Sequence, residues 1–363
     1  MLDFRYLAMG VAIVHYWLLG MRGGERVVEA LCRLAPDADI FTLFYDPEKV
    51  SPLIRSHRIQ ASFLNSMKWC YRSLLPLTPM ALEHFDLRGY DLVISSESGP
   101  AKGVITSSST RHVCYCHTPM RYLWDLYPDY LHEWTRSRIK RALMAPLSNY
   151  LRVWDYSTAA RVDEFVANSE NVRRRIFKTY RRDASVIYPP VAVQSFRHEP
   201  AEDYYLIVSE LVSYKRLDLA IRYFSRTGRK LIVAGDGPQA RDLRRAAGKN
   251  VEFCGRVPDD QLRTLFARCR AFVLPGEEDF GMTAVEAVAS GKAVIALGRG
   301  GVLESVPAEG AFLFGTPDEA AFGAAVERFE AEEASIPHAA LQTWATRFSE
   351  AEFDQKMRAV LYR

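Results

Sequence analysis

Residues 271–297 constrain the fold more than any other stretch of this 363-residue chain. The apolar run Ala271–Leu274 predicts a short buried strand, and a loop rich in acidic residues and glycine follows it. An apolar helix is expected from about Met282 to Ala289, ended by Gly291, before a second apolar run at Ala293–Leu297. Strand, loop, helix and strand in this order indicate a parallel α/β sheet, and such sheets bind ligands at the carboxyl ends of their strands.

Two carboxylates flank the expected start of that helix. Glu278 lies in the loop and Glu286 in the helix, and Gly281, Met282 and Thr283 stand between them. Backbone N–H groups at a helix start, together with the helix dipole, suit a phosphate, whereas carboxylates suit sugar hydroxyls. The pattern therefore predicts a nucleotide sugar with its diphosphate on the helix end. The structural alternative is one acid that complements the helix dipole and a solvated Glu286.

The run EEDFGMTAVEAVASGKAVIA, followed by Gly300 and Gly301, resembles the E-x7-E signature of the retaining glycosyltransferases of family four. The resemblance implies that Glu278 meets the transferred sugar and Glu286 the ribose of the nucleotide. It also implies the α/β GT-B fold, with two doubly wound Rossmann-like domains that face across a cleft and a C-terminal helix that crosses back to the first domain.

Alternating apolar runs and helical stretches in both halves of the chain favour two doubly wound domains as well. Strands are expected at Gly10–Trp17, Ile40–Phe44, Tyr90–Ser95, Arg111–Cys116, Val166–Ser169, Tyr204–Ser209, Lys230–Ala234 and Val251–Cys254. Val166–Ser169 resembles the last strand of the family's first domain, and the pattern after Val306 predicts helices only. Paired prolines at 188–193 predict an extended linker. We expect an acceptor-side domain at 1–195, a nucleotide-sugar-binding domain at 196–345 and the C-terminal helix at 346–363.

Two further features are expected at the same edge of the first sheet. Gly23 and Gly24 precede a helix, where glycine lets a backbone approach a ligand closely, although a plain strand-to-helix turn would also use them. His117 directly follows the strand Arg111–Cys116. The resemblance places the Gly23–Gly24 loop against the donor diphosphate and the acceptor, and His117 against the donor sugar.

Lys215 and Arg216 stand directly before an expected helix of the second domain. Two cations beside a helix start would neutralise a diphosphate, whereas a solvated surface pair is the alternative. The resemblance implies that they hold the leaving diphosphate. Many family members carry an arginine where this chain has Glu210, so the two cations lack that partner. Val257, in the loop after Val251–Cys254, is expected beside the nucleotide base.

The stretch HTPMRYLWDLY at 117–127 resembles one subgroup, the mannosyltransferases of O-antigen and exopolysaccharide assembly. That likeness implies GDP-mannose as the donor and a polyprenyl-diphosphate-linked glycan as the acceptor, in surface polysaccharide and lipopolysaccharide biosynthesis. Tyr122, Trp124 and Tyr127 would form a sugar-stacking wall or pack a helix. The alternatives are a UDP-sugar donor, a GT-B sugar-nucleotide 2-epimerase and a non-catalytic binding subunit. A nicotinamide dehydrogenase is disfavoured because the first glycine-rich loop lacks G-x-G-x-x-G.

Composition limits which cofactors and partners are expected. A net charge of +3 gives no nucleic-acid signal, and the six cysteines lack metal-ligand spacing, so neither nucleic acid, metal nor other cofactor is expected. Reduced cysteines and no apolar run long enough to span a bilayer favour a cytoplasmic protein. Residues 6–21 resemble a signal-peptide core only weakly, because Asp3 and His15 disturb the pattern.

Three segments would suit an anionic membrane surface at the inner face of the cell membrane. The apolar and aromatic stretch at 57–82 carries Lys68 and Arg72, and we favour a packed core helix over an interfacial segment there. The basic clusters Arg136–Arg141 and Arg173–Arg182 are the other two, one of which is expected to meet anionic phospholipid.

Overall fold

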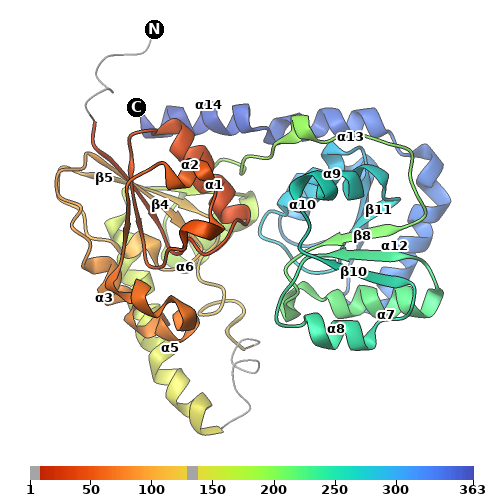
Figure 1. Ribbon diagram of the computed structural model, residues 1–363, viewed down its shortest axis with the longest axis horizontal. Coiled ribbons are helices and arrows are strands. Elements are labelled where there is room, and N and C mark those ends of the chain that lie inside the picture. Colours follow the sequence, from red (N-terminus) through yellow and green to blue (C-terminus); the bar gives the residue numbers. More distant parts are fainter. Residues whose placement is uncertain (1–8, 129–137) are drawn as a thin grey trace. The chain divides into compact units, whose positions relative to one another are not determined.

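The computed structural model describes residues 9–128 and 138–363, which form two compact units (Figure 1). The first domain comprises the chain up to Pro190 together with Phe353–Arg363, and the second comprises Val191–Glu352. Within the described residues, no helix is long and apolar enough to cross a lipid bilayer.

The first domain is built on a seven-stranded parallel sheet of order β3-β2-β1-β4-β5-β6-β7. The central strand β1 is buried along its whole length, and Ile13 lies opposite Ile40 of β2 and Ile94 of β4. Such continuous apolar strands are expected where helices cover both faces of a parallel sheet. The strands are β1 (Val11–His15), β2 (Asp39–Thr42), β3 (Ile59–Ala61), β4 (Leu92–Glu97), β5 (Arg111–Cys116), β6 (Glu164–Ala167) and β7 (Ala184–Val186).

Helices cover both faces of this sheet. Ile13 packs in a cluster with residues of α1 and α14, whereas Val14 packs in a separate cluster with residues of α3 and α5. The helices are α1 (Gly23–Leu34), α2 (Pro52–Arg55), α3 (Thr78–Glu83), α5 (Arg138–Thr158), α6 (Glu170–Tyr180) and α14 (Glu350–Leu361).

The C-terminal helix α14 belongs to the first domain, as the expected fold requires. Phe353, Met357 and Leu361 are buried among residues of β1 and α1, and α14 lies beside α1 and α2 in Figure 1. The Tyr362 hydroxyl donates a 2.8 Å hydrogen bond to the Leu34 carbonyl at the end of α1. The helical spacing of the apolar tail residues is therefore explained by one face that completes the first core.

The second domain has a six-stranded parallel sheet of order β10-β9-β8-β11-β12-β13. Its strands are β8 (Tyr205–Val208), β9 (Leu231–Ala234), β10 (Val251–Gly255), β11 (Ala271–Leu274), β12 (Ala293–Leu297) and β13 (Ala311–Phe314). Its helices are α7 (Leu217–Thr227), α8 (Ala240–Ala246), α9 (Asp259–Arg268), α10 (Met282–Ala289), α11 (Val302–Ser305), α12 (Glu319–Glu332) and α13 (His338–Ala345). The expected strand-loop-helix-strand unit is thus β11, α10 and β12.

Two edge strands correct the sequence-based prediction. Val166–Ser169 is not the last strand of the first domain, because β7 pairs in parallel with β6 and puts Ala184 opposite Phe165. The chain after Val306 is not purely helical either, since β13 pairs with β12 along four residues. Both strands are short and lie at an edge of their sheet, where no second neighbour demands a longer apolar run.

The stretch at 57–82 is not the single core helix that we favoured. It contains β3, an irregular run of 3-10 turns at Phe63–Leu77 and then α3. Leu64 and Leu74 are buried, but the side chains of Phe63 and Trp69 are 48% and 83% exposed. The segment therefore packs on the core through a few residues and presents aromatic side chains to solvent.

Candidate functional site

The loop between β11 and α10 carries the first predicted acid close to a predicted cation. Oε1 of Glu278 lies 2.8 Å from Nζ of Lys215, and both side chains are 18% exposed. Glu278 follows β11 and Lys215 follows β8, and these two strands are neighbours in the sheet. The structure thus brings Glu278 and Lys215 together at the carboxyl edge of the second sheet, where open α/β sheets bind ligands.

Backbone packing fixes the position of this pair. A Cβ atom on Gly276 would lie 2.5 Å from Cα of Lys215, so only glycine lets the two loops approach this closely. On the other side, Gly301 N–H donates a 2.9 Å hydrogen bond to the Glu278 carbonyl, and Glu278 forms an isolated parallel bridge with Gly300. The Gly300–Gly301 pair therefore holds the acidic loop in place.

The start of α10 has the geometry expected of an anion site. Gly281 precedes the helix with φ of 88°, a left-handed conformation that favours glycine. Met282 and Thr283 form the first turn and are partly buried, and Glu286 is partly buried one turn further along. The first N–H groups of a helix have no acceptor within it, so this end can receive phosphate oxygens.

Arg216 and Val257 occupy different surroundings from Lys215. Arg216 has φ of 50° and joins a 3-10 turn to α7, and its guanidinium lies 3.3 Å from a carboxylate oxygen of Asp218. Val257 is partly buried in the loop between β10 and α9. Arg216 therefore stands at the start of α7 while its side chain pairs with Asp218 on the same helix.

In the first domain, the predicted glycines and histidine lie at one edge of the sheet. α1 begins at Gly23, and a Cβ on Gly24 would lie 3.8 Å from Nε2 of His117 and 3.5 Å from Cε1 of His15. Nε2 of His117 is 2.9 Å from the Ser96 hydroxyl at the end of β4. Burial, with a smaller contribution from His15, lowers the pKa of His117 to about 3. His117 is therefore a neutral hydrogen-bonding group at physiological pH.

Several other expectations for the first domain concern side chains whose packing the structure describes. Trp124 donates a 2.7 Å hydrogen bond to Asp155, Tyr122 packs against a core cluster, and Tyr127 lies under the Arg152 guanidinium. These contacts show packing against the core and α5, and the sugar-stacking wall stays a prediction. Paired aspartates in an Asp-x-Asp tripeptide can bind a metal ion. One such tripeptide ends at Asp39, but it lies at the amino end of β2, away from the predicted site.

The basic clusters have different outcomes. In Arg173–Arg182, the side chain of Arg173 pairs with Glu170 and that of Arg175 lies 3.6 Å from Asp125. Arg182 donates hydrogen bonds to the backbone carbonyls of Ala159 and Val162. Structural contacts thus engage much of this cluster. The cluster Arg136–Arg141 lies outside the residues whose side chains the structure describes.

Sequence reasoning missed His15, Ser96 and Glu25 beside His117. His15 is fully buried at the end of β1, and its Nδ1 is 3.2 Å from the Ser96 carbonyl. Nε2 of His15 lies 4.0 Å from Oε1 of Glu25, which is in the first turn of α1. The available signal was the position of His15 and Ser96 at the carboxyl ends of two neighbouring strands.

Two known protein families match this chain, and each match falls mainly on one domain. The family described as "Glycosyltransferase Family 4" matches residues 21–195, and the family described as "Glycosyl transferases group 1" matches residues 192–343. The chain belongs to the GT-B glycosyltransferases. The GT-B fold predicted from the sequence is thus confirmed, and each of its two α/β domains has a parallel sheet.

Individual glycosyltransferases are similar to this chain at modest sequence identity. Alpha-1,3/1,6-mannosyltransferase ALG2 of Mus musculus is 25% identical over 86% of this chain and 85% of its own length. O-antigen chain mannosyltransferase C of Escherichia coli is 29% identical over 35% of this chain and 39% of its own length. An uncharacterized glycosyltransferase of Methanocaldococcus jannaschii is 28% identical, and the match spans 42% of that protein. The chain therefore spans about two fifths of the last two relatives and most of the first.

Solved structures show the same fold. Anabaena HepE, in a complex with UDP and glucose, has a TM-score of 0.70 at 15% identity and covers 97% of this chain and 99% of its own. Sucrose-phosphate synthase of Thermosynechococcus elongatus has a TM-score of 0.69 at 16% identity, covering 97% and 98%. At these identities the likeness concerns the fold alone.

Proposed function

We propose that this GT-B glycosyltransferase is a retaining hexosyltransferase that moves mannose from GDP-mannose to a hydroxyl of a polyprenyl-diphosphate-linked glycan. The observation that carries the proposal is the 2.8 Å pair of Lys215 and Glu278 at the strand edge beside the start of α10. A cation, the first N–H groups of a helix and a second acid at Glu286 fit a nucleoside diphosphate joined to a sugar. The mannosyltransferase relatives support the choice of sugar.

The proposed chemistry is electrostatic. As the bond between the anomeric carbon and the phosphate oxygen breaks, its electron pair stays with that oxygen and negative charge grows on the leaving phosphate. Lys215, Arg216 and the N–H groups of Gly281–Thr283 would stabilise that charge without a metal. Metal independence stays a prediction. In this proposal the acceptor attacks from the leaving-group face and the phosphate takes its proton.

The alternative mechanism is a double displacement, in which a carboxylate attacks the anomeric carbon. Asp125 is the acid nearest in sequence to His117, but its contacts give this role little support. Its carboxylate is 3.2 Å from Nε of Arg121 and 3.6 Å from Nε of Arg175. Both guanidinium groups engage this carboxylate, and such charge-assisted contacts reduce the electron density that its oxygens can offer to a sugar carbon. Attack from the leaving-group face therefore fits the described residues better.

A thermal-shift panel tests the donor. GDP-mannose or GDP at one hundred times its dissociation constant should stabilise the protein by about 2.7 kcal/mol. For a domain of this size that corresponds to a rise in melting temperature of roughly 5–10 °C. UDP-glucose and UDP are the competing arm, because HepE has been solved with UDP and glucose. A larger shift with uridine nucleotides would replace GDP-mannose in the proposal.

Two controls accompany the panel. Glu286→Ala should reduce the nucleotide-induced shift, whereas Glu327→Ala, an exposed acid on α12, should leave it unchanged. Incubation with donor alone then separates a transferase, which hydrolyses the donor slowly, from a 2-epimerase, which converts the sugar. A protein that no guanosine or uridine nucleotide stabilises would contradict the whole assignment.

We also propose that the first domain docks on an anionic phospholipid surface at the cytosolic face of the membrane. The 3-10 run and α3 expose apolar side chains, with Phe63, Trp69 and Met80 at 48%, 83% and 55% exposure. Lys68 and Arg72 lie in the same stretch. Each basic residue near an anionic surface contributes about 1 kcal/mol, and apolar side chains add to this by insertion.

Co-sedimentation with vesicles that contain phosphatidylglycerol measures this association. The double variant Phe63→Ser/Met80→Ser is expected to bind vesicles roughly tenfold more weakly, because two side chains can no longer enter the interface. Leu303→Ser is the matched control, since Leu303 is 55% exposed in the second domain. Equal sedimentation of the wild-type protein, the double variant and Leu303→Ser at low salt would refute the membrane proposal.

A further inference from the structure

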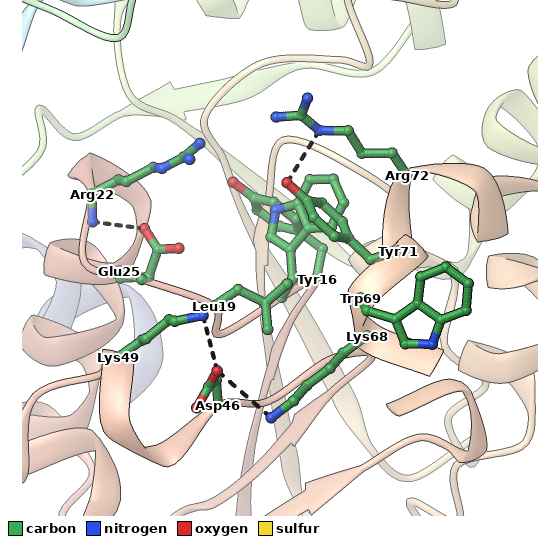
Figure 2. Close-up of a pocket in the computed structure, with 12 residues that line it drawn as sticks. Tyr16, Leu19, Arg22, Glu25, Asp46, Lys49, Lys68, Trp69, Tyr71 and Arg72 are labelled. Atoms are coloured by element: carbon green, nitrogen blue, oxygen red, sulfur yellow. Dashed lines mark hydrogen bonds and ion pairs between the residues drawn. The ribbon is translucent and has the colours of Figure 1, made fainter. Parts of the chain in front are cut away.

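The first domain contains a pocket of about 430 Å³ that none of the predicted site residues lines (Figure 2). It is lined by the segment that follows β1, by Asp46 and Lys49 after β2, and by the 3-10 run Phe63–Leu77. All of its lining residues belong to the first domain. Three groups of side chains meet there, namely aromatic rings, cations and two carboxylates.

Aromatic rings form one side of the pocket. Trp17 and Tyr71 contact each other edge to face, with ring centroids 4.6 Å apart, and Tyr16 lies 5.1 Å from Trp17. Trp69 also lines the pocket and is 83% exposed. Rigid aromatic side chains with a polar tip suit the mixed apolar and hydroxyl surface of a sugar ring.

Cations outnumber carboxylates among the lining residues. Nζ of Lys49 and Nζ of Lys68 lie 3.1 Å and 3.6 Å from Asp46, and hydrogen bonding to Lys49 lowers the pKa of that carboxyl. Arg22 and Arg72 add two guanidinium groups. Since one carboxylate serves two lysines, the pocket keeps an excess of positive charge that suits an anionic ligand.

Glu25 supplies the other carboxylate. Its side chain is 5% exposed, and Oε2 accepts a 3.0 Å hydrogen bond from the Arg22 N–H as part of the cap of α1. Oε1 lies 4.0 Å from Nε2 of His15, a buried atom with no hydrogen-bond partner in the described structure. Oε2 of Glu25 thus serves the helix cap, and Oε1 is the oxygen that a ligand hydroxyl at this end of the pocket would meet.

The pocket adjoins the predicted histidine through Tyr16. A Cβ on Gly24 would lie 3.6 Å from the Tyr16 hydroxyl and 3.8 Å from Nε2 of His117. Tyr16 lines the pocket, and its ring centroid is 4.4 Å from that of His15. A ligand seated on the aromatic side of the pocket would therefore reach the carboxyl edge of the first sheet, where His117 lies.

We propose that this pocket is an acceptor subsite for a glycan that carries an anionic group. In this assignment the cations bind the anionic group, the aromatic rings contact the sugar and Glu25 accepts a hydrogen bond from a sugar hydroxyl. The inference rests on the proposed glycosyltransfer, which requires an acceptor. The anionic group has two chemical sources, the diphosphate of a lipid carrier or the carboxylate of a uronic acid.

Calorimetric titration with three probes tests the subsite. The probes are farnesyl-diphosphate-linked N-acetylglucosamine, methyl glucuronide and the uncharged octyl glucoside. Binding of the first or second, with at least tenfold weaker binding of the third, is expected and identifies the source of the charge. Lys68→Ala and Arg72→Ala should each weaken the bound probe roughly tenfold, because each removes a charged hydrogen-bond donor. Arg55→Ala, an exposed cation outside the pocket, should not.

Glu25→Gln gives a second measurement that preserves the helix cap, because glutamine also completes a capping box. It should weaken the anionic probe roughly fivefold, since a neutral acceptor forms the weaker hydrogen bond. Equal affinity for octyl glucoside, unchanged affinity in both cation variants, or no binding of any probe would overturn the subsite. Nucleotide thermal shifts on the same preparations separate the two ideas. A stabilising nucleotide without glycan binding removes the subsite alone, whereas loss of both removes the proposed function.

Discussion

Replacing Lys215 with alanine is expected to lower the rate of sugar transfer by about 10²–10³-fold, the usual effect of removing one electrostatic contact to the transition state. Nζ of Lys215 lies 2.8 Å from Glu278 in the unliganded protein, and both groups are largely shielded from water. A shielded ammonium group interacts more strongly with developing phosphate charge than an exposed one does. Release of nucleoside diphosphate from the donor identified by the thermal-shift panel measures the effect.

The control for this variant is Lys230→Ala. Lys230 is in the same domain, but its side chain is 51% exposed and pairs only loosely with Glu252, at 3.9 Å. That variant should retain full turnover. Thermal melting must show that Lys215→Ala is folded, because the substitution leaves Glu278 without its cation. A folded Lys215→Ala protein with wild-type turnover would remove Lys215 from the proposed chemistry.

Every interior strand of the two described sheets could be predicted from the sequence, but of their described edge strands only β10 was expected. Runs such as those of β11 and β12 are continuous and apolar because neighbouring strands and helices enclose them. β7 and β13 have three and four residues and lie at sheet edges. A three-residue strand such as β7 leaves no clear periodic signal, whereas β13 is a four-residue apolar run like β11 and was overlooked in a region predicted to be helical.

The candidate site divides in the same way. Glu278, Gly281 and Glu286 share one loop and helix, and their spacing alone indicated a phosphate and sugar site. The contact between Glu278 and Lys215 joins the ends of two strands far apart in sequence, and it was not predicted; the resemblance implied only that Glu278 meets the sugar and Lys215 the diphosphate. The pocket in the first domain was missed because its walls come from three segments, at residues 16–25, 46–49 and 68–72. None of these segments indicates a pocket by itself.

One buried ion pair was also beyond sequence reasoning, and it supports the first domain close to the predicted loops. Lys102 and Asp155 are fully buried and form a direct salt bridge. Asp155 also accepts hydrogen bonds from Trp124 at 2.7 Å and from the Tyr180 hydroxyl at 2.9 Å. Nζ of Lys102 lies 4.7 Å from the centre of the Tyr180 ring. The Asp155 carboxylate on α5 therefore links three other segments of the chain, which carry Lys102, Trp124 and Tyr180.

Asp155→Ala is expected to lower the free energy of unfolding by about 3–5 kcal/mol, because it leaves the buried Lys102 ammonium without its counter-ion. The indole N–H of Trp124 and the hydroxyl of Tyr180 lose an acceptor as well, which adds to the loss. Urea denaturation followed by tryptophan fluorescence measures the change, provided that the transition of the first domain is resolved from that of the second.

Two comparisons show whether the uncompensated charge is the cause. Removing both charges in Lys102→Met/Asp155→Leu should recover most of the lost stability, because an apolar pair of similar volume avoids burying an isolated ion. Glu170→Ala breaks the 2.7 Å pair with Arg173 on α6, where both side chains are more than 40% exposed, and should leave the stability nearly unchanged. If the double variant were as unstable as Asp155→Ala, the lost hydrogen bonds to Trp124 and Tyr180 would be the cause. The ion pair would then be incidental to the stability of the first domain.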